Sequence, residues 1–366
     1  EASGASDPQA HQRLLRTASW DEATLGQARR KSVAETLGES EGMLIFDETG
    51  FLKAGDKSVG VGRQYSGTAG KIGNCQVAVF GAYTSSKGRT LYDTRLYLPE
   101  AWTSDRVRRH EAGIPDSTKF ATKAELAGQM LDQAVSENLP IGWVVADTVY
   151  GANFDLRQKL IDYECRFVME VPKNTTVYQD RPLILHASPA RGSRSPGRPK
   201  RRRIKGKTIR VDAMADNFGS SRWTRIQVAN GSKGPRVYDW AARRVVARDK
   251  KKGSQDLWLL VRRSVARPSE KAYYLAWAPA QTPLAKLAGV AANRWPIEEG
   301  FKESKWEVGL ADYQVRQWTP WHRHIELAML AHLFLTQLRI EYGTEAPQGP
   351  LSMAEARRLY RIACRP

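Results

Sequence analysis

Two aspartates stand where short apolar runs end. Asp47 closes the run MLIF in the stretch MLIFDETGF (43–51), and Asp147 closes the run IGWVVA (141–146). A short apolar run bounded by turn-forming residues is typical of a buried strand. An acid at the end of such a strand costs free energy unless it reaches water, caps a helix or meets a positive charge. If the two strands are neighbours in one sheet, a divalent cation between the carboxylates would offset their repulsion.

A third acid for such a site is expected on a helix beside the sheet, and the stretch NRWPIEEGFKESKWEVGL (293–310) offers four. Helical geometry gathers the apolar positions into one stripe, and Glu298 lies beside that stripe. The stripe consists of Ile297, Phe301 and Val308. The other acids fall on the far side and are predicted to face solvent: Glu299, Glu303 and Glu307. Glu298 is flanked by three cations: Arg294, Lys302 and Lys305.

The spacing of Arg294, Glu298 and Lys305 matches the R-E-K part of the Y-R-E-K signature of DDE transposases from bacterial insertion sequences. Three stretches closely resemble the insertion-sequence 701 group of that family: IFDETGFLKAG, VVADTVYG and RWPIEEGFKESKWEVGLADYQVRQWTPWHRH. The resemblance extends over about residues 10–340, with the motifs in the order that the family has. The signature's Tyr falls on position 291, where this chain has Ala291. This departure puts one contact to the DNA end in doubt and leaves the metal ligands untouched.

The resemblance implies an α/β fold of the RNase H-like type, a mixed five-stranded sheet with flanking helices, interrupted by a β-rich insertion domain. Asp47 would lie on the first strand, Asp147 just after the fourth, and Glu298 on a later helix. The stretch between the second and third acids is too long for a bare fold of this kind. The predicted organisation is an N-terminal helical segment (1–40), a first part of the catalytic core (41–172), a β-rich insertion with a basic loop (173–270), a second part of the core (271–342) and a C-terminal tail (343–366).

Local patterns place these acids on regular elements. Apolar runs predict strands at 43–47, 75–84, 90–99 and 141–147. Helical periodicity predicts a helix at 122–139 with Thr122 as its N-cap. Two further helices are expected at about 283–310, with a break near Pro296, and at 321–341.

The family chemistry implied by the resemblance is two-metal-ion catalysis. Asp47, Asp147 and Glu298 would hold two Mg²⁺ ions, for which Mn²⁺ would substitute, to activate the attacking oxygen and stabilise the leaving one. Water would cut DNA at the element end, and the freed 3′-hydroxyl would then join target DNA. The cations Arg294, Lys302 and Lys305 are predicted to bind phosphates beside the scissile bond. The alternative is that they only neutralise Glu298 as ion-pair partners. Trp295 either stacks on an extruded base or packs where Pro296 starts the helix.

The charge of the chain favours a polyanionic partner. Fifty-seven Lys and Arg residues against 39 Asp and Glu give a formal net charge of +18. The stretch 191–210 holds ten basic residues and no acidic one, so the excess is concentrated. Within it, the GRP at 197–199 resembles an AT-hook core, whose arginine enters a narrow minor groove. The alternative is a basic loop that binds phosphates without reading sequence. The predicted DNA contacts in this loop are Arg198, Lys200, Arg201, Arg202 and Arg203.

The expected partner is double-stranded DNA, both element ends and target, with a homodimer forming on the ends. The cysteines Cys75, Cys165 and Cys364 are scattered and odd in number, which fits a reducing bacterial cytoplasm and argues against a disulfide framework. No apolar run approaches membrane-spanning length, so no membrane partner is expected and the nucleoid is the predicted location. Two other functions stay open: a stand-alone metal-dependent DNA nuclease, and a domesticated transposase that only binds DNA. Loss of an acid would indicate the second, and all three are present.

Overall fold

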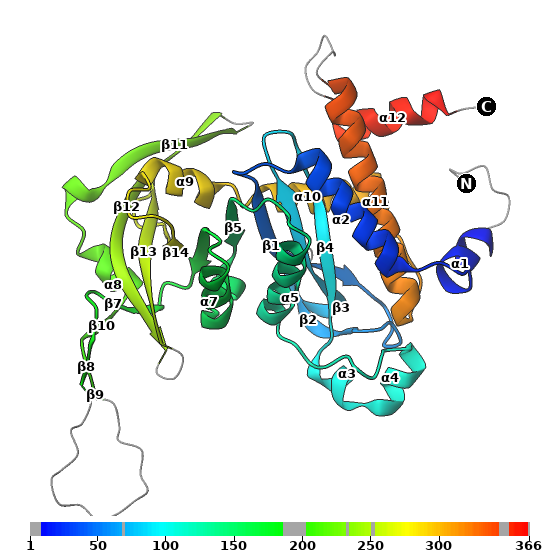
Figure 1. Ribbon diagram of the computed structural model, residues 1–366, viewed down its shortest axis with the longest axis horizontal. Coiled ribbons are helices and arrows are strands. Elements are labelled where there is room, and N and C mark those ends of the chain that lie inside the picture. Colours follow the sequence, from blue (N-terminus) through cyan, green and yellow to red (C-terminus); the bar gives the residue numbers. More distant parts are fainter. Residues whose placement is uncertain are drawn as a thin grey trace, which may run out of the picture. The chain divides into compact units, whose positions relative to one another are not determined.

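The chain forms two units, and unit 1 contains both the N-terminal and the C-terminal part of the chain (Figure 1). A computed structural model describes residues 9–67, 70–185, 203–231, 234–249, 253–343 and 351–364. Unit 1 consists of residues 1–146 and 293–366, and unit 2 of residues 147–292.

Unit 1 contains a mixed sheet with the strand order β4–β3–β1–β5, and the short strand β2 also pairs with β3. Strand β1 runs antiparallel to β3 and parallel to β5. The elements of unit 1 are α1 (Gln9–Arg16), α2 (Glu22–Leu37), β1 (Met43–Leu52), β2 (Gly62–Ser66), β3 (Lys71–Thr84), β4 (Arg89–Tyr97), α3 (Glu100–Ser104), α4 (Arg106–Ala112), α5 (Lys123–Ser136), β5 (Trp143–Ala146), α10 (Pro296–Glu307), α11 (Trp318–Gly343) and α12 (Met353–Ala363). This mixed sheet with flanking helices confirms the predicted RNase H-like fold class.

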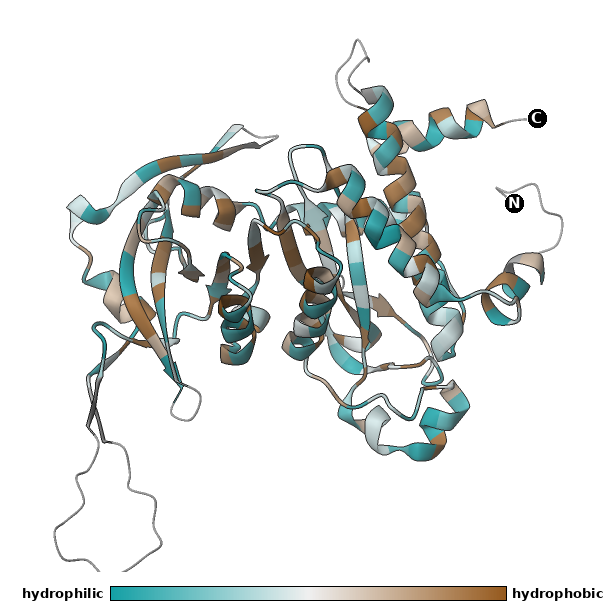
Figure 2. Cartoon of the chain, viewed as in Figure 1, coloured by the Kyte–Doolittle hydropathy of each residue, from teal (hydrophilic) through white to brown (hydrophobic). Residues whose placement is uncertain are grey.

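Helices cover both faces of this sheet. On one face, Lys123 of α5 forms an ion pair with Glu48 of β1 at 2.6 Å. On the other face, the ring of Phe301 in α10 packs edge-on against Phe80 of β3, with 5.3 Å between ring centroids. Hydrophobic residues dominate β1 and β5 between these layers (Figure 2). Side chains alternate along a strand, and the neighbours Asp47 and Glu48 therefore point toward different helices.

Strand β1 is longer than the sequence predicted. Its expected end was Asp47, but pairing with β3 continues to Leu52, opposite Cys75. The turn-prone Gly50 is tolerated inside the strand because its missing side chain makes room for Ser66. A Cβ on Gly50 would lie 2.6 Å from Ser66 Oγ. Asp47 therefore lies within a paired strand rather than at a surfacing strand end.

A buried arginine joins α2 to the sheet and to α11. Arg29 forms an ion pair with Glu326 and is 1% exposed. It also donates hydrogen bonds to the carbonyls of Leu91 and Tyr92 in β4, at 3.1 and 2.8 Å. Because a buried charge is tolerated only when it is paired and hydrogen-bonded, these contacts fix the three elements together.

Unit 2 is rich in β-structure. Its main sheet has the order β10–β7–β12–β13–β14–β6, with β11 paired to β12, and β8 and β9 form a separate two-stranded antiparallel sheet. Its elements are α6 (Thr148–Gly151), α7 (Phe154–Asp162), β6 (Phe167–Val171), β7 (Thr176–Tyr178), β8 (Leu183–Leu185), β9 (Arg203–Lys205), β10 (Thr208–Arg210), α8 (Val211–Asp216), the 3₁₀ turn Ser220–Arg222, β11 (Thr224–Gly231), β12 (Gly234–Asp249), β13 (Gly253–Ser264), β14 (Lys271–Trp277) and α9 (Leu284–Ala292).

The length and hydrophobicity of the helices were compared with those of membrane-spanning segments. Across the described ranges, every helix is too short or too polar to cross a bilayer.

Candidate active site

Asp47 projects from β1 toward helix α10 and meets an arginine there. Arg294 Nη1 lies 2.6 Å from Asp47 Oδ2, and Arg294 Nη2 lies 2.5 Å from Glu298 Oε1. One guanidinium therefore joins two of the three predicted acids. The Asp47 side chain is 14% exposed, while that of Glu298 is 49% exposed. The charge-assisted hydrogen bond from Arg294 offsets the free-energy cost of burying the Asp47 carboxylate, whereas Glu298 stays open to solvent.

Asp147 is the first residue of unit 2 and follows the last residue of β5. It caps α6, and its Oδ1 accepts a hydrogen bond from the backbone N–H of Val149 at 2.8 Å. In unit 1, Ala146 is paired in register with Phe46. The residues that directly precede the two aspartates are thus neighbours on parallel strands.

Lys305 lies about two helical turns beyond Glu298 and reaches back to β1. Its Nζ donates to Thr49 Oγ1 at 2.8 Å and to the carbonyl of Gly50 at 3.3 Å. Burial lowers the pKa of Lys305 below its ordinary value. Thr49 was not predicted to take part, although it lies two residues after Asp47 and therefore on the same face of β1. The alternation of side chains along a strand, with a period of two residues, could have identified Thr49 from the sequence.

The other two predicted DNA contacts of this helix region are open to solvent. Lys302 is exposed on α10. Trp295 precedes the first residue of α10 and is 45% exposed, and the guanidinium of Arg89 lies 5.9 Å from the centre of its ring. An exposed tryptophan beside an arginine is compatible with stacking on a base.

The prediction that Glu299, Glu303 and Glu307 face solvent is wrong, because all three are partly buried, whereas Glu298 is the exposed acid of this helix. Glu303 Oε1 lies 2.8 Å from Arg89 Nη2 and its side chain is 16% exposed. Glu307 pairs with Arg357 of α12 at 3.1 Å. The helix has a second packed side, because α11 and α12 also contact α10. A helical wheel drawn from this segment alone contains no information about those neighbours.

The environment of Glu303 keeps it ionised. Burial raises its pKa, but the facing His332 and the Arg89 guanidinium lower it more, and the net result is a pKa of about 2. His332 Nε2 is 3.7 Å from the carboxylate, beyond hydrogen-bond length, so the contact from Arg89 carries more weight. Arg339 of α11 adds a second cation at 3.9 Å. This cluster fixes the side of α10 that lies away from Glu298.

Within the described ranges, no group of three or more His, Cys, Asp or Glu side chains is arranged to hold a metal ion. The donor set of unit 1 nonetheless fits a hard cation, since Asp47 and Glu298 supply carboxylate oxygens that already converge on one positive group. Asp47 and Glu298 would be the residues of unit 1 that hold such a cation, and Arg294 contacts both of these carboxylates.

The basic loop falls mostly outside the residues that the structure describes. This applies to Arg198, Lys200, Arg201 and Arg202. The backbone of Arg203 begins β9, which pairs with β8.

Comparisons with known proteins show the family to which the chain is similar. A family model described as a DDE superfamily endonuclease matches residues 2–235, more than half of the chain. The chain is also 31% identical over 150 residues to a probable transposase for insertion sequence element IS701 from Microchaete diplosiphon. That match covers 40% of this chain and 36% of the relative, so it spans only about a third of the relative's length. Glu298 and its helix lie beyond the region matched by the family model.

The paired state of Glu303 leads to a prediction about stability. Its folded pKa of about 2 lies below its ordinary value of 4.5, so its contribution to the unfolding free energy is complete above pH 4.5 and is lost as the pH falls toward 2. The shift corresponds to about 3 kcal/mol. We expect Glu303→Gln to lower the unfolding free energy at pH 7 by roughly 2–4 kcal/mol. Urea denaturation at pH 7 and pH 3.5 would show the difference from wild type shrinking at the lower pH.

The matched control is Glu299→Gln on the same helix, which we expect to change the unfolding free energy by less than about 0.5 kcal/mol. Equal effects of the two substitutions would contradict the assignment of Glu303 to the packed side of α10.

Proposed function

The chain belongs to the DDE superfamily of endonucleases, and on that premise we propose that it is a DNA transposase. It would cut phosphodiester bonds at the ends of an insertion sequence and join the freed 3′-hydroxyls to target DNA. The substrates would be the double-stranded element ends and the target, held by a homodimer at the nucleoid. The resemblance of three motifs to the insertion-sequence 701 group supports this, as does the IS701 relative.

The observation that carries the proposal is the convergence of Asp47 and Glu298 on Arg294. These acids are far apart in sequence, yet both contact one cationic group on the same face of β1. The register of Phe46 with Ala146 supports Asp147 as the third member, because each aspartate follows one of these paired residues. The proposed catalytic residues are therefore Asp47, Asp147 and Glu298.

The same three carboxylates are the proposed ligands of two Mg²⁺ ions, with Mn²⁺ as a substitute. When bound, such ions activate an attacking oxygen and stabilise the leaving oxygen of an in-line phosphodiester displacement. Asp47 is suited to this role because it lies in the part of β1 that pairs with β3, directly after the residues that also pair with β5. Glu298 is suited because it remains exposed and can reach an incoming substrate.

The cations of α10 are proposed to hold the DNA backbone. Arg294 would exchange a carboxylate for a phosphate next to the scissile bond, since a guanidinium binds either group through two parallel hydrogen bonds. Lys305 would supply a point charge from its place on Thr49, and Lys302 would contact the backbone from the exposed side. Trp295 would stack on a base at the element end.

The basic loop is proposed as a separate DNA contact through Arg198, Lys200, Arg201, Arg202 and Arg203. It would bind phosphates, and Arg198 would in addition enter an A·T-rich minor groove if the resemblance to an AT-hook holds.

The central prediction concerns the three acids. Asp47→Ala, Asp147→Ala and Glu298→Ala should each reduce cleavage of a terminal-repeat duplex by roughly a thousandfold or more, because several kcal/mol of charge stabilisation depend on them. DNA affinity should remain close to wild type. Gel-based cleavage and filter binding on the same duplex measure both. Glu299→Ala is the control and should stay within about twofold of wild type. A severe loss in the control with an active Glu298→Ala would overturn the ligand assignment.

Metal removal gives a second prediction. Cleavage should stop in EDTA and return with Mg²⁺ or Mn²⁺, whereas Ca²⁺ should support binding without efficient cutting, because its longer and looser coordination positions a nucleophile poorly. Cutting at full rate in EDTA would exclude the metal ligands proposed here. Assays that follow joining of a labelled 3′-end to plasmid DNA separate a transposase from a stand-alone nuclease, which would cut without joining.

The loop prediction tests binding rather than chemistry. Replacing Arg198, Lys200, Arg201, Arg202 and Arg203 with Ala should lower DNA affinity and flatten the slope of log K against log salt by about 0.9 for each phosphate that the loop no longer neutralises. Melting temperature should barely change, since the segment has little apolar content. Arg198→Ala alone should weaken binding to A·T-rich duplexes selectively if that side chain reads the minor groove. A five-fold variant with an unchanged salt slope would mean that the loop does not contact DNA.

A further inference from the structure

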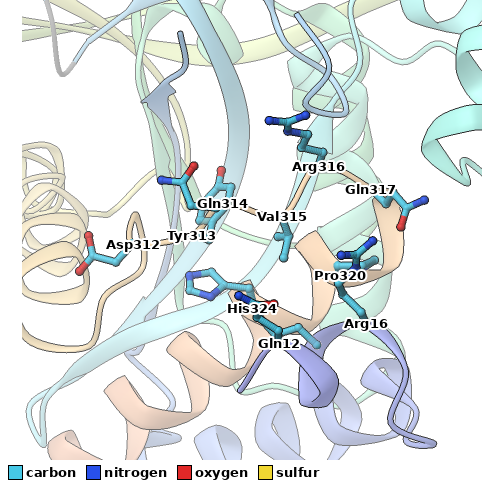
Figure 3. A pocket seen from close by; sticks show the side chains of 11 residues that line it. Gln12, Arg16, Asp312, Tyr313, Gln314, Val315, Arg316, Gln317, Pro320 and His324 are labelled. Carbon is cyan, nitrogen blue, oxygen red and sulfur yellow. The ribbon is translucent and has the colours of Figure 1, made fainter. Parts of the chain in front are cut away.

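Arg157 of unit 2 is a buried cation, unlike the arginines that line a cavity of unit 1. That cavity, of about 560 Å³, lies between α1 and the segment that precedes α11, and Arg16 and Arg316 on its wall are exposed (Figure 3). Water solvates those two guanidinium groups. Arg157 lies in α7 and is only 5% exposed, and burial lowers its pKa to about 10. Removing a guanidinium from water costs free energy that its partners must offset.

The partners of Arg157 are neutral. Its Nη1 donates a hydrogen bond to the carbonyl of Gly151, and its Nε donates to Oε1 of Gln255 at 3.1 Å. The centre of the Phe154 ring lies 5.8 Å from the guanidinium. No carboxylate pairs with Arg157 in the ranges that the structure describes. Because neutral groups offset the cost of burial less than an acid does, a hydrophobic side chain would be expected here if filling the core were the only requirement.

Gln255 is itself held so that its side-chain oxygen faces Arg157. It lies on β13 and is 2% exposed, and its Nε2 donates to the carbonyl of Phe154 at 3.1 Å and to Oε1 of Gln158 at 3.2 Å. Both amide hydrogens are therefore used toward α7, and the oxygen is left for the guanidinium. The sheet of unit 2 thus fixes the direction of the Arg157 side chain.

The other contact of Arg157 is to the one-turn helix α6, whose N-cap is Asp147. Four residues are too few for a helix to be stable alone, because the first turn costs more entropy than its hydrogen bond offsets. The last residue of α6, Gly151, lies against β6, where a Cβ would be 2.0 Å from the carbonyl oxygen of Glu170. Arg157 binds the carbonyl of this same Gly151, at the helix end where carbonyls have no partner within the helix and a cation is favourable.

Hydrogen bonds continue from Gly151 to Asp147. The backbone N–H of Gly151 donates to the carbonyl of Asp147 at 2.8 Å, and the Asp147 carboxylate accepts from the N–H of Val149, also at 2.8 Å. The direction of this carboxylate therefore depends on α6 keeping its helical turn. The buried guanidinium at one end of the turn is connected to the proposed metal ligand at the other end through the backbone of one residue.

We propose that Arg157 is a positioning residue for the catalytic site, which fixes α6 and thereby the direction of the Asp147 carboxylate. The inference rests on the proposed function, since it takes Asp147 as a metal ligand. It adds a residue that lies outside the three motifs on which the family resemblance depends. Removing a group that supports a metal ligand commonly lowers metal affinity by about 10–100-fold.

The first experiment needs neither metal nor DNA. Hydrogen–deuterium exchange of a peptide that spans residues 147–153 is followed by mass spectrometry in metal-free wild type and in Arg157→Met, which removes the charge and keeps a long side chain. Exchange in this peptide should be at least roughly tenfold faster in the variant, because α6 loses a hydrogen bond from a charged donor. Peptides from β14 should stay within about threefold of their wild-type rates.

Leu160→Ala is the matched control for a general loss of stability. Leu160 is fully buried on the same helix, and its truncation leaves Arg157 and both hydrogen-bond partners in place. The cavity that it creates should lower the melting temperature. Exchange in the 147–153 peptide should nevertheless stay within about threefold of wild type.

The second experiment measures metal binding directly. Free Mn²⁺ is followed by electron paramagnetic resonance during titration of protein bound to a duplex that represents an already cut end. Half-saturation should require at least roughly tenfold more Mn²⁺ in Arg157→Met than in wild type. Arg157→Lys keeps the charge and lacks the fork of donors, so it should give an intermediate rise of about threefold, and it decides the test if Arg157→Met does not fold. DNA affinity in Ca²⁺ should stay within about twofold of wild type for both variants.

Two outcomes would overturn the proposal. One is unchanged exchange and unchanged Mn²⁺ dependence in the Arg157 variants, and the other is equal acceleration of exchange by Leu160→Ala. Either result would mean that Arg157 only completes the core of unit 2. A wild type that cuts and joins DNA alongside such variants would retain the transposase and refute the role of Arg157. A wild type with Arg157-dependent exchange that neither binds Mn²⁺ nor cuts would refute the proposed function and, with it, the catalytic role of this contact.

Discussion

The repulsion between acids that converge on one site is the constraint on which this structure depends. Asp47 is largely buried on a paired strand, and burying its carboxylate costs free energy unless a positive group reaches it. Arg294 supplies that group and shares it with Glu298. The same guanidinium joins the start of the helix to the strand.

Everything that fixes α10 contributes to this pairing. The Phe301 ring on Phe80 sets the distance of the helix from the sheet, and Lys305 on Thr49 sets its rotation near the C-terminal end. Glu303 holds the far side through Arg89 and the charged groups of α11. Arg29 then joins α11 to β4 and α2. Most of these contacts are electrostatic and partly buried, so they define one position of the helix and would lose strength sharply if a partner were removed.

The family resemblance predicted the fold class and local patterns predicted the strands, but neither predicted the surroundings of the acids. Apolar runs identified the strands before Asp47 and Asp147, and their adjacency appears in the register of Phe46 with Ala146. The end of β1 could not be predicted from the local sequence. The strand continues through Gly50 because it pairs with β3 and because Ser66 occupies the space beside that glycine. Glu303 was misjudged for a similar reason: its partner Arg89 lies 214 positions earlier in the chain. Local periodicity reports which side of a helix is apolar, whereas ion pairs across a core depend on tertiary packing.

Because unit 2 is inserted within unit 1, the chain passes between the two units twice. The polypeptide passes from unit 1 to unit 2 between Ala146 and Asp147, and it returns between Ala292 and Asn293. One junction is therefore adjacent to a proposed ligand, and the other lies one residue before Arg294. A substitution at either junction would therefore alter the backbone beside a residue with a proposed role in the site. Exchange of unit 2 for a different sequence during evolution would thus be constrained less by its interior than by the few peptides at which it is attached.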